Sequence, residues 1–138
     1  MSEISLNELL IPEKVVEIDF PGFSGLKFQL CFLSRNELTK LRKKCVNTVF
    51  DRRTKQPEER LDEDKFLEEY SKAIIKGWSG FKLEYVEKLL LVDVSTQDPQ
   101  AEMAYTPDNA KVLLEQSTIF DDWITEVVAD LENFTSNS

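Results

Sequence analysis

The chain has 138 residues, of which 41% are hydrophobic and 31% are charged, and its formal net charge is −9. This length fits one small domain with a modest core. No apolar run approaches the roughly 20 residues of a membrane-spanning helix, and the first residues lack the basic segment and apolar core of a signal peptide. We therefore expect one domain with no membrane partner, either intracellular or a virion component made in a cytoplasm.

The charge is unevenly distributed along the chain. Nine basic residues lie between Ser34 and Arg60, whereas Lys111 is the only basic residue from Asp93 onward. The acidic total argues against general nucleic-acid binding, which needs a positive surface. A basic segment and an acidic half attract each other within one chain or between copies, so the pattern permits a homo-oligomer.

The residues needed for common catalytic sites are missing. There is no histidine, and no glycine motif of the kind that binds phosphate. Cys31 and Cys45 form no Cys-x-x-Cys motif, so we expect two free thiols packed as small hydrophobes. The acidic clusters at 62–64 and 121–122 stand where helices should begin, which explains them without a metal. We expect a protein that is not an enzyme and binds no cofactor and no metal.

An arm and two strands are predicted at the N-terminus. Residues 1–13 should form a loose arm with one apolar helical turn, which Pro12 stops. Apolar residues alternate with polar ones over residues 16–20 and again over 26–32, and a turn-rich segment separates the two runs. This pattern predicts a β-hairpin, whose apolar face should pack on helices.

Helices should make up most of the remaining chain. Ser34 with Glu37 forms a capping box, and helical spacing of apolar residues follows as far as Val49. Residues 51–61 are polar and predict an exposed, mobile loop. Asp62 should cap the next helix, which Gly77 should end in a left-handed conformation, before a tight aromatic turn in which Trp78 fills the core.

The last third of the chain predicts three more helices. Residues 82–92 fit one helix, with a strand at 88–94 as the competing interpretation, and residues 95–105 fit a loop. Thr106-Pro107 is a strong helix start, and Ser117 should cap a final helix that reaches Phe134. The predicted fold is α+β and mainly α: an N-terminal β-hairpin followed by about five helices in one domain, residues 14–134, with a frayed tail at 135–138.

The final helix has an apolar stripe that is wider than a small core needs. Adjacent apolar pairs recur along it, so either the whole stripe lines the core, or one edge lines the core while the other contacts a partner. The candidate partner-binding residues are Phe120, Trp123, Ile124, Val127, Val128 and Leu131.

Three motifs resemble the tail assembly chaperones of long-tailed, siphovirus-type bacteriophages. They are the Gly-Trp-Ser-Gly turn at 77–80, the Tyr-Thr-Pro-Asp-Asn helix start at 105–109, and the helix with spaced aromatics from Phe120 to Phe134. Their order and spacing cover about half of the chain, from Lys72 onward. The stretch between Phe81 and Tyr105 is longer than in many members of that family.

The resemblance implies a function without catalysis. Tail assembly chaperones bind apolar helices of the tape measure protein, keep it soluble and help to recruit tail tube subunits. It also implies a location in the host cytoplasm rather than a permanent place in the virion. Two other classes remain open: an acidic DNA-mimic inhibitor of a host DNA-binding protein, and a small structural tail or head-completion protein. An unrecognised hydrolase ranks below both.

The first prediction concerns metals. Elemental analysis of the purified protein should find neither zinc nor iron in stoichiometric amount, because the chain has no histidine and no paired cysteines. A stoichiometric metal would contradict the interpretation of the acidic clusters as helix caps.

Overall fold

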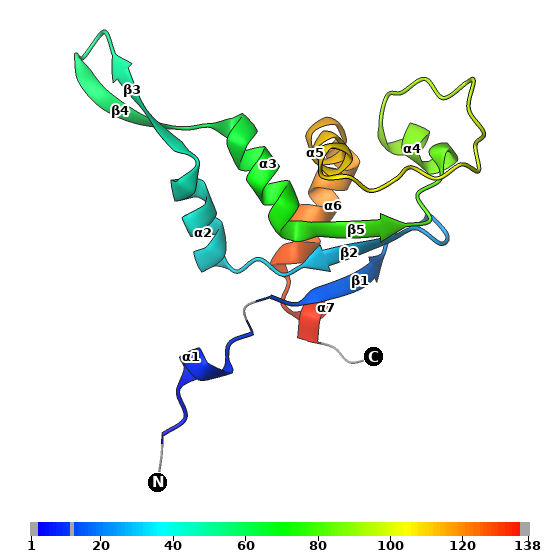
Figure 1. Cartoon of the computed structure of the whole chain (residues 1–138), viewed down its shortest axis with the longest axis horizontal. Helices are drawn as coiled ribbons and strands as arrows, with labels where there is room; N and C mark the ends of the chain where they lie inside the picture. The colour runs from blue at the N-terminus through cyan, green and yellow to red at the C-terminus, as the bar shows by residue number, and fades with distance from the viewer. Residues whose placement is uncertain (1–2, 12, 136–138) are drawn as a thin grey trace.

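Two antiparallel sheets and seven helices form the part of the chain that the computed structural model describes, residues 3–11 and 13–135 (Figure 1). The strands are β1 (Val15–Asp19), β2 (Lys27–Cys31), β3 (Val46–Asp51), β4 (Gln56–Leu61) and β5 (Ile75–Ser79). The helices are α1 (Leu6–Leu9), α2 (Arg35–Lys44), α3 (Glu63–Ile74), α4 (Leu83–Leu89), α5 (Pro107–Gln116), α6 (Thr118–Ala129) and α7 (Glu132–Thr135). The predicted stop at Pro12 and most of the predicted frayed tail lie outside the described residues.

The N-terminal hairpin is confirmed, but it belongs to a larger sheet. β1 pairs with β2 from Val15–Cys31 to Asp19–Lys27, and β5 pairs with the other edge of β2. The sheet order is therefore β1-β2-β5. One hairpin followed only by helices is thus a wrong fold prediction, because the α+β chain places its strands between its helices as well as before them.

The end of α3 shows why β5 was missed. Ile74 and Ile75 both fit the apolar face of a helix, so helical spacing alone does not mark where the helix stops. The chain leaves the helix after Ile74 because β2 offers an open edge, and the β-branched and aromatic residues of β5 suit a pleated strand. Gly77 therefore lies inside a strand opposite Gln29, and its predicted left-handed conformation is wrong.

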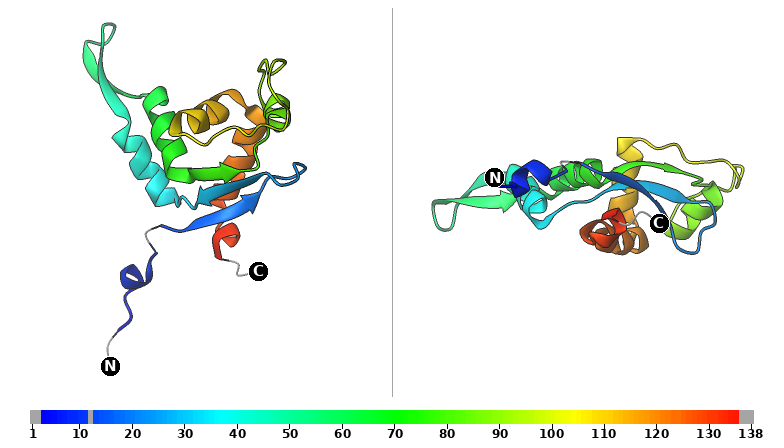
Figure 2. Two further views of the ribbon diagram at one scale, coloured as in Figure 1. Left: turned by 45° about the vertical axis from the view of Figure 1, so that its right-hand side comes forward. Right: turned by 90° about the horizontal axis from the view of Figure 1, so that it is seen from below.

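Residues 51–61 are exposed as predicted, but the predicted loop is wrong, because these residues form the turn and the second strand of a second hairpin. β3 pairs with β4 from Val46–Leu61 to Asp51–Gln56, which also ends the preceding helix at Lys44 rather than near Val49. At the tip, the Asp51 carboxylate accepts the Arg53 backbone N–H at 2.8 Å and closes a tight turn. The hairpin projects from the body beyond α2 and α3 (Figures 1 and 2).

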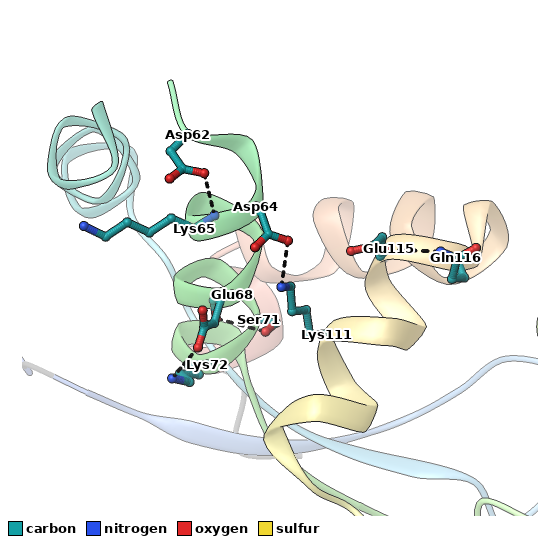
Figure 3. Close-up of polar contacts among 9 residues, drawn as sticks. All are labelled: Asp62, Asp64, Lys65, Glu68, Ser71, Lys72, Lys111, Glu115 and Gln116. Carbon is teal, nitrogen blue, oxygen red and sulfur yellow. Dashed lines mark hydrogen bonds and ion pairs between the residues drawn. The ribbon is translucent and has the colours of Figure 1, made fainter. Parts of the chain in front are cut away.

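The four predicted helix caps are confirmed. In each, a side-chain oxygen accepts the backbone N–H three residues later, which satisfies one orphan donor of the first turn. The caps are Ser34, Asp62, Thr106 and Ser117. Figure 3 shows the Asp62 cap, where the hydrogen bond to the Lys65 backbone lowers the pKa of the carboxyl.

The helix predicted at 82–92 and the final helix both end earlier than the sequence predicted. α4 lies inside the predicted helix, and residues 90–105 contain no named strand, so the competing strand at 88–94 is wrong. The final helix breaks at Asp130, whose carboxylate accepts the Glu132 backbone N–H at 3.1 Å. The short α7 follows, and it carries Phe134 into the core.

The core lies on one face of the three-stranded sheet. Phe28 of β2 is fully buried there, and its ring lies 5.0 Å from Phe120 and 5.7 Å from Trp123 of α6, between ring centroids. The opposite face is polar, with Lys27 placed between Glu17 and Asp19. A half-solvated antiparallel sheet of this kind gives the alternation that the sequence displayed in its first two strands.

A surface ion pair joins two helices that pack beside the core. The Lys111 ammonium of α5 lies 2.8 Å from the Asp64 carboxylate of α3 (Figure 3). The hydrogen bond to Asp64 raises the pKa of Lys111. Such exposed pairs add little stability, so apolar burial, rather than this ion pair, holds the two helices together.

The second prediction uses the two glycines near the end of β5. Gly80 has φ +70°, and a Cβ there would overlap the carbonyl oxygen of Gly25. Gly80→Val should lower the free energy of unfolding by more than the roughly 1–2 kcal/mol that a left-handed backbone alone costs. At Gly77 a Cβ meets only the flexible end of the Gln29 side chain, at 2.6 Å, so Gly77→Val should cost much less. Urea unfolding of both variants tests this order, and the reverse order would contradict the assignment of β5.

Candidate interaction surfaces

The acidic side chains at the helix starts and the two cysteines serve structural contacts among the described residues. No group of three or more His, Cys, Asp or Glu side chains in this part of the chain is placed to hold a metal. Asp62 caps α3, and Asp64 pairs with Lys111. Both cysteines are free and buried, as predicted, and burial raises the pKa of the Cys31 thiol, which disfavours the reactive thiolate.

The predicted partner-binding residues of the last helices divide into three sets by burial. Phe120, Ile124 and Val128 are fully buried and form the face of α6 that covers the sheet. Trp123 and Val127 are half-buried against the same core. Leu131 is exposed, at the edge of a cavity of about 280 Å³ that Leu10, Phe32 and Phe134 also line. The wide stripe therefore serves the core on most of its width, and only its far edge remains available to a partner.

A larger apolar surface lies between α5 and the segment that follows α4. Leu91 is fully exposed, and Val92 and Val112 beside it are exposed as well. They border two adjoining hollows, of about 140 and 390 Å³, which share Leu90, Val92 and Val112 as walls. Aromatic and aliphatic side chains form the floor of the smaller hollow: Trp78, Phe81, Val86, Met103 and Leu113. We call this surface the α4–α5 groove.

Hydrogen bonds fix the floor of the α4–α5 groove. The Trp78 indole donates to the Met103 carbonyl at 2.8 Å, and the Tyr105 hydroxyl donates to the Ile75 carbonyl at 2.9 Å. The Asn109 amide donates to the Ala104 carbonyl at 3.0 Å. Trp78 thus packs in the core as predicted, and it also anchors the long segment that forms one groove wall. A wall held this way keeps its shape before any partner binds.

The sequence did not predict the groove, because the apolar residues of its wall look like the continuation of a helix. The run from Leu89 to Val92 looks like the last turn of an amphipathic helix, but α4 ends at Leu89 and the next residues are extended. An apolar run that continues past a helix end, followed by a polar segment, was the available signal.

Among the described residues, none of the helices combines the length and apolar character that a membrane crossing requires.

Comparison with known proteins places the chain in a phage context. A family model described as the YdaY prophage protein matches residues 34–138, from the cap of α2 onward. The chain belongs to the YdaY prophage protein family. No curated protein and no solved structure matches it. The phage origin implied by the motif resemblance is therefore confirmed for this YdaY-family chain, at the level of a phage-related protein.

The third prediction separates core from surface. Phe120→Ala should lower the free energy of unfolding by about 3–5 kcal/mol, because it empties a fully buried site against Phe28. Leu91→Ala should change it by no more than about 0.5 kcal/mol, since Leu91 is fully exposed. Urea titration followed by tryptophan fluorescence measures both. A severe loss in Leu91→Ala would mean that the groove is closed in solution.

Proposed function

We propose that this YdaY-family protein is a phage tail assembly chaperone. It binds apolar helices of the tape measure protein, keeps that protein soluble and helps to recruit tail tube subunits. It acts in the host cytoplasm, without catalysis, and leaves the assembled virion. The observation that carries this proposal is the exposed, preformed α4–α5 groove.

The groove suits an apolar helix. Its floor is aromatic and aliphatic, and the few polar side chains, Asn109 and Gln116, lie among apolar neighbours. Amphipathic helices bind such grooves through side chains spaced three and four residues apart. Met103 adds an unbranched, polarisable side chain that adapts to different client residues. A surface with these properties masks helices whose sequence varies along a long client.

The long stretch between Phe81 and Tyr105 is where this chain departs from many tail assembly chaperones, and it contributes to the proposed binding surface. This stretch, which many tail assembly chaperones have only in shortened form, supplies one wall of the groove through Leu90, Leu91 and Val92. The net charge of −9 keeps a complex with an apolar client soluble, which a chaperone needs. Binding a client and keeping it soluble requires no catalytic groups.

The fourth prediction tests the client and the groove together. The tape measure protein of the same prophage should be insoluble when expressed alone and soluble when this chain is co-expressed. Leu91→Asp should reduce the soluble tape measure protein by at least about tenfold, because a charge then faces an apolar client. Rescue should depend little on salt, since apolar burial drives it. Soluble client is quantified by gel after centrifugation.

Two matched variants locate the binding surface. Ile119→Asp and Leu131→Asp place the same charge at exposed apolar positions on α6 and beside α7. Both should keep the rescue if the groove holds the client. Loss of rescue in these variants, with Leu91→Asp unaffected, would move the site to the outer edge of the final helices. No rescue by the parent chain, together with its presence in purified particles, would favour a structural tail or head-completion protein.

A further inference from the structure

The β3–β4 hairpin is amphipathic, and among the described residues its more apolar face is left open to solvent. Cross-strand partners share a face of a hairpin. One face carries the pairs Val46–Leu61, Thr48–Glu59 and Phe50–Pro57, and the other carries Asn47–Arg60, Val49–Glu58 and Asp51–Gln56, so the first face is the more apolar one. Phe50 is 63% exposed, and every residue of β4 is exposed. A two-stranded hairpin is marginal in water, so a face of this kind calls for a partner.

The same end of the molecule is strongly basic. Between Lys40 and Arg60 there are eight basic and three acidic residues, in a chain whose net charge is −9. Arg52, Arg53 and Lys55 form the exposed hairpin tip, and Lys43 of α2 lines a hollow of about 360 Å³ on the apolar face together with Val46, Thr48 and Glu59. The occupant of this face should therefore be both apolar and acidic.

The N-terminal arm, residues 3–11, has that chemistry. Its five large apolar residues, Ile4, Leu6, Leu9, Leu10 and Ile11, are 63% to 80% exposed. Leu6, Leu9 and Leu10 share one side of the short helix α1, because their spacing is three and four residues. The charged residues of the arm are Glu3 and Glu8, and it contains no basic residue.

The arm and the hairpin project from the body in different directions. In Figure 1 and in the left view of Figure 2 the arm points downward from the start of β1, whereas the hairpin points upward beyond α2; seen from below, in the right view of Figure 2, the two lie on the same side. We propose that the arm of one copy docks on the apolar face of the β3–β4 hairpin of a second copy. This contact is heterologous, so it joins copies head to tail.

Two other occupants fit the observations less well. A symmetric pairing of two hairpins would bring two basic ends together, which charge repulsion opposes. A nucleic acid would use the positive charge but would leave Phe50, Pro57 and Leu61 uncovered, and the Arg60 guanidinium is already paired with Glu58 at 3.1 Å. The acidic and apolar arm matches both properties of the hairpin.

The test is a complementation experiment on the full-length chain without a client. Light scattering after size exclusion should show concentration-dependent association of the parent, weaker at high salt. Leu6→Asp removes a working arm and Phe50→Asp a working hairpin, and each should weaken self-association by at least about tenfold. A mixture of the two should form a heterodimer and nothing larger, because one intact arm meets one intact hairpin. Leu91→Asp, in the α4–α5 groove, is the matched control and should associate like the parent.

The outcomes separate the alternatives. A parent that stays monomeric at high micromolar concentration would overturn the proposal, as would self-association that survives Leu6→Asp. Arg53→Glu changes only the exposed tip and should weaken association at low salt; association unchanged by it would contradict the role of charge. Salt-dependent binding of a labelled DNA duplex or RNA that is lost in Arg53→Glu, with no self-association, would assign the hairpin to nucleic acid. Because no client is present, none of these results depends on the proposed chaperone function.

Discussion

The burial of Phe28 is the constraint on which the rest of this structure depends. Its ring is fully buried and contacts five other aromatic rings, which come from the β1–β2 turn, from β5 and the turn after it, and from α6. A site of this kind fixes the position of α6 on the sheet, because aromatic packing tolerates little change in volume. Once α6 lies there, its buried stripe is committed to the core.

Because most of the apolar stripe of α6 is buried in the core, a partner has to bind other surfaces of the protein. A stripe with paired apolar residues looks excessive for a small core, but the sheet and the loops above it absorb most of its width. Uncovered apolar surface lies at Leu91 after α4, at Phe50 in the projecting hairpin and along the N-terminal arm. The groove and the hairpin differ in charge, so they suit different occupants: a client helix in the groove and a second copy on the hairpin.

Local signals in the sequence predicted the helix starts and the first hairpin, and they failed where pairing between distant segments decides the structure. Ser34 and Ser117 cap their helices through hydrogen bonds to residues three positions later, so a short stretch of sequence is enough to predict them. β5 exists because β2, more than forty residues earlier, has a free edge. The charged hairpin at 46–61 has few apolar residues, so its polar composition concealed a regular alternation at Val46, Thr48 and Phe50. The groove could not be predicted without β5, because Trp78 of that strand forms part of its floor.

The long segment between Phe81 and Tyr105 illustrates how an irregular stretch becomes a binding surface. A loop of this length loses much conformational freedom when it is ordered, and that cost must be offset by contacts. Backbone hydrogen bonds from Leu83 to Ala101 and from Met103 to Phe81, at 2.8 and 2.7 Å, close it at its base. The Glu102 carboxylate accepts the Gly80 backbone N–H at 2.8 Å, which ties the same base to the strained turn after β5. The loop is thereby ordered at its base by polar contacts, and its apolar residues near Leu91 stay free to be buried by something else.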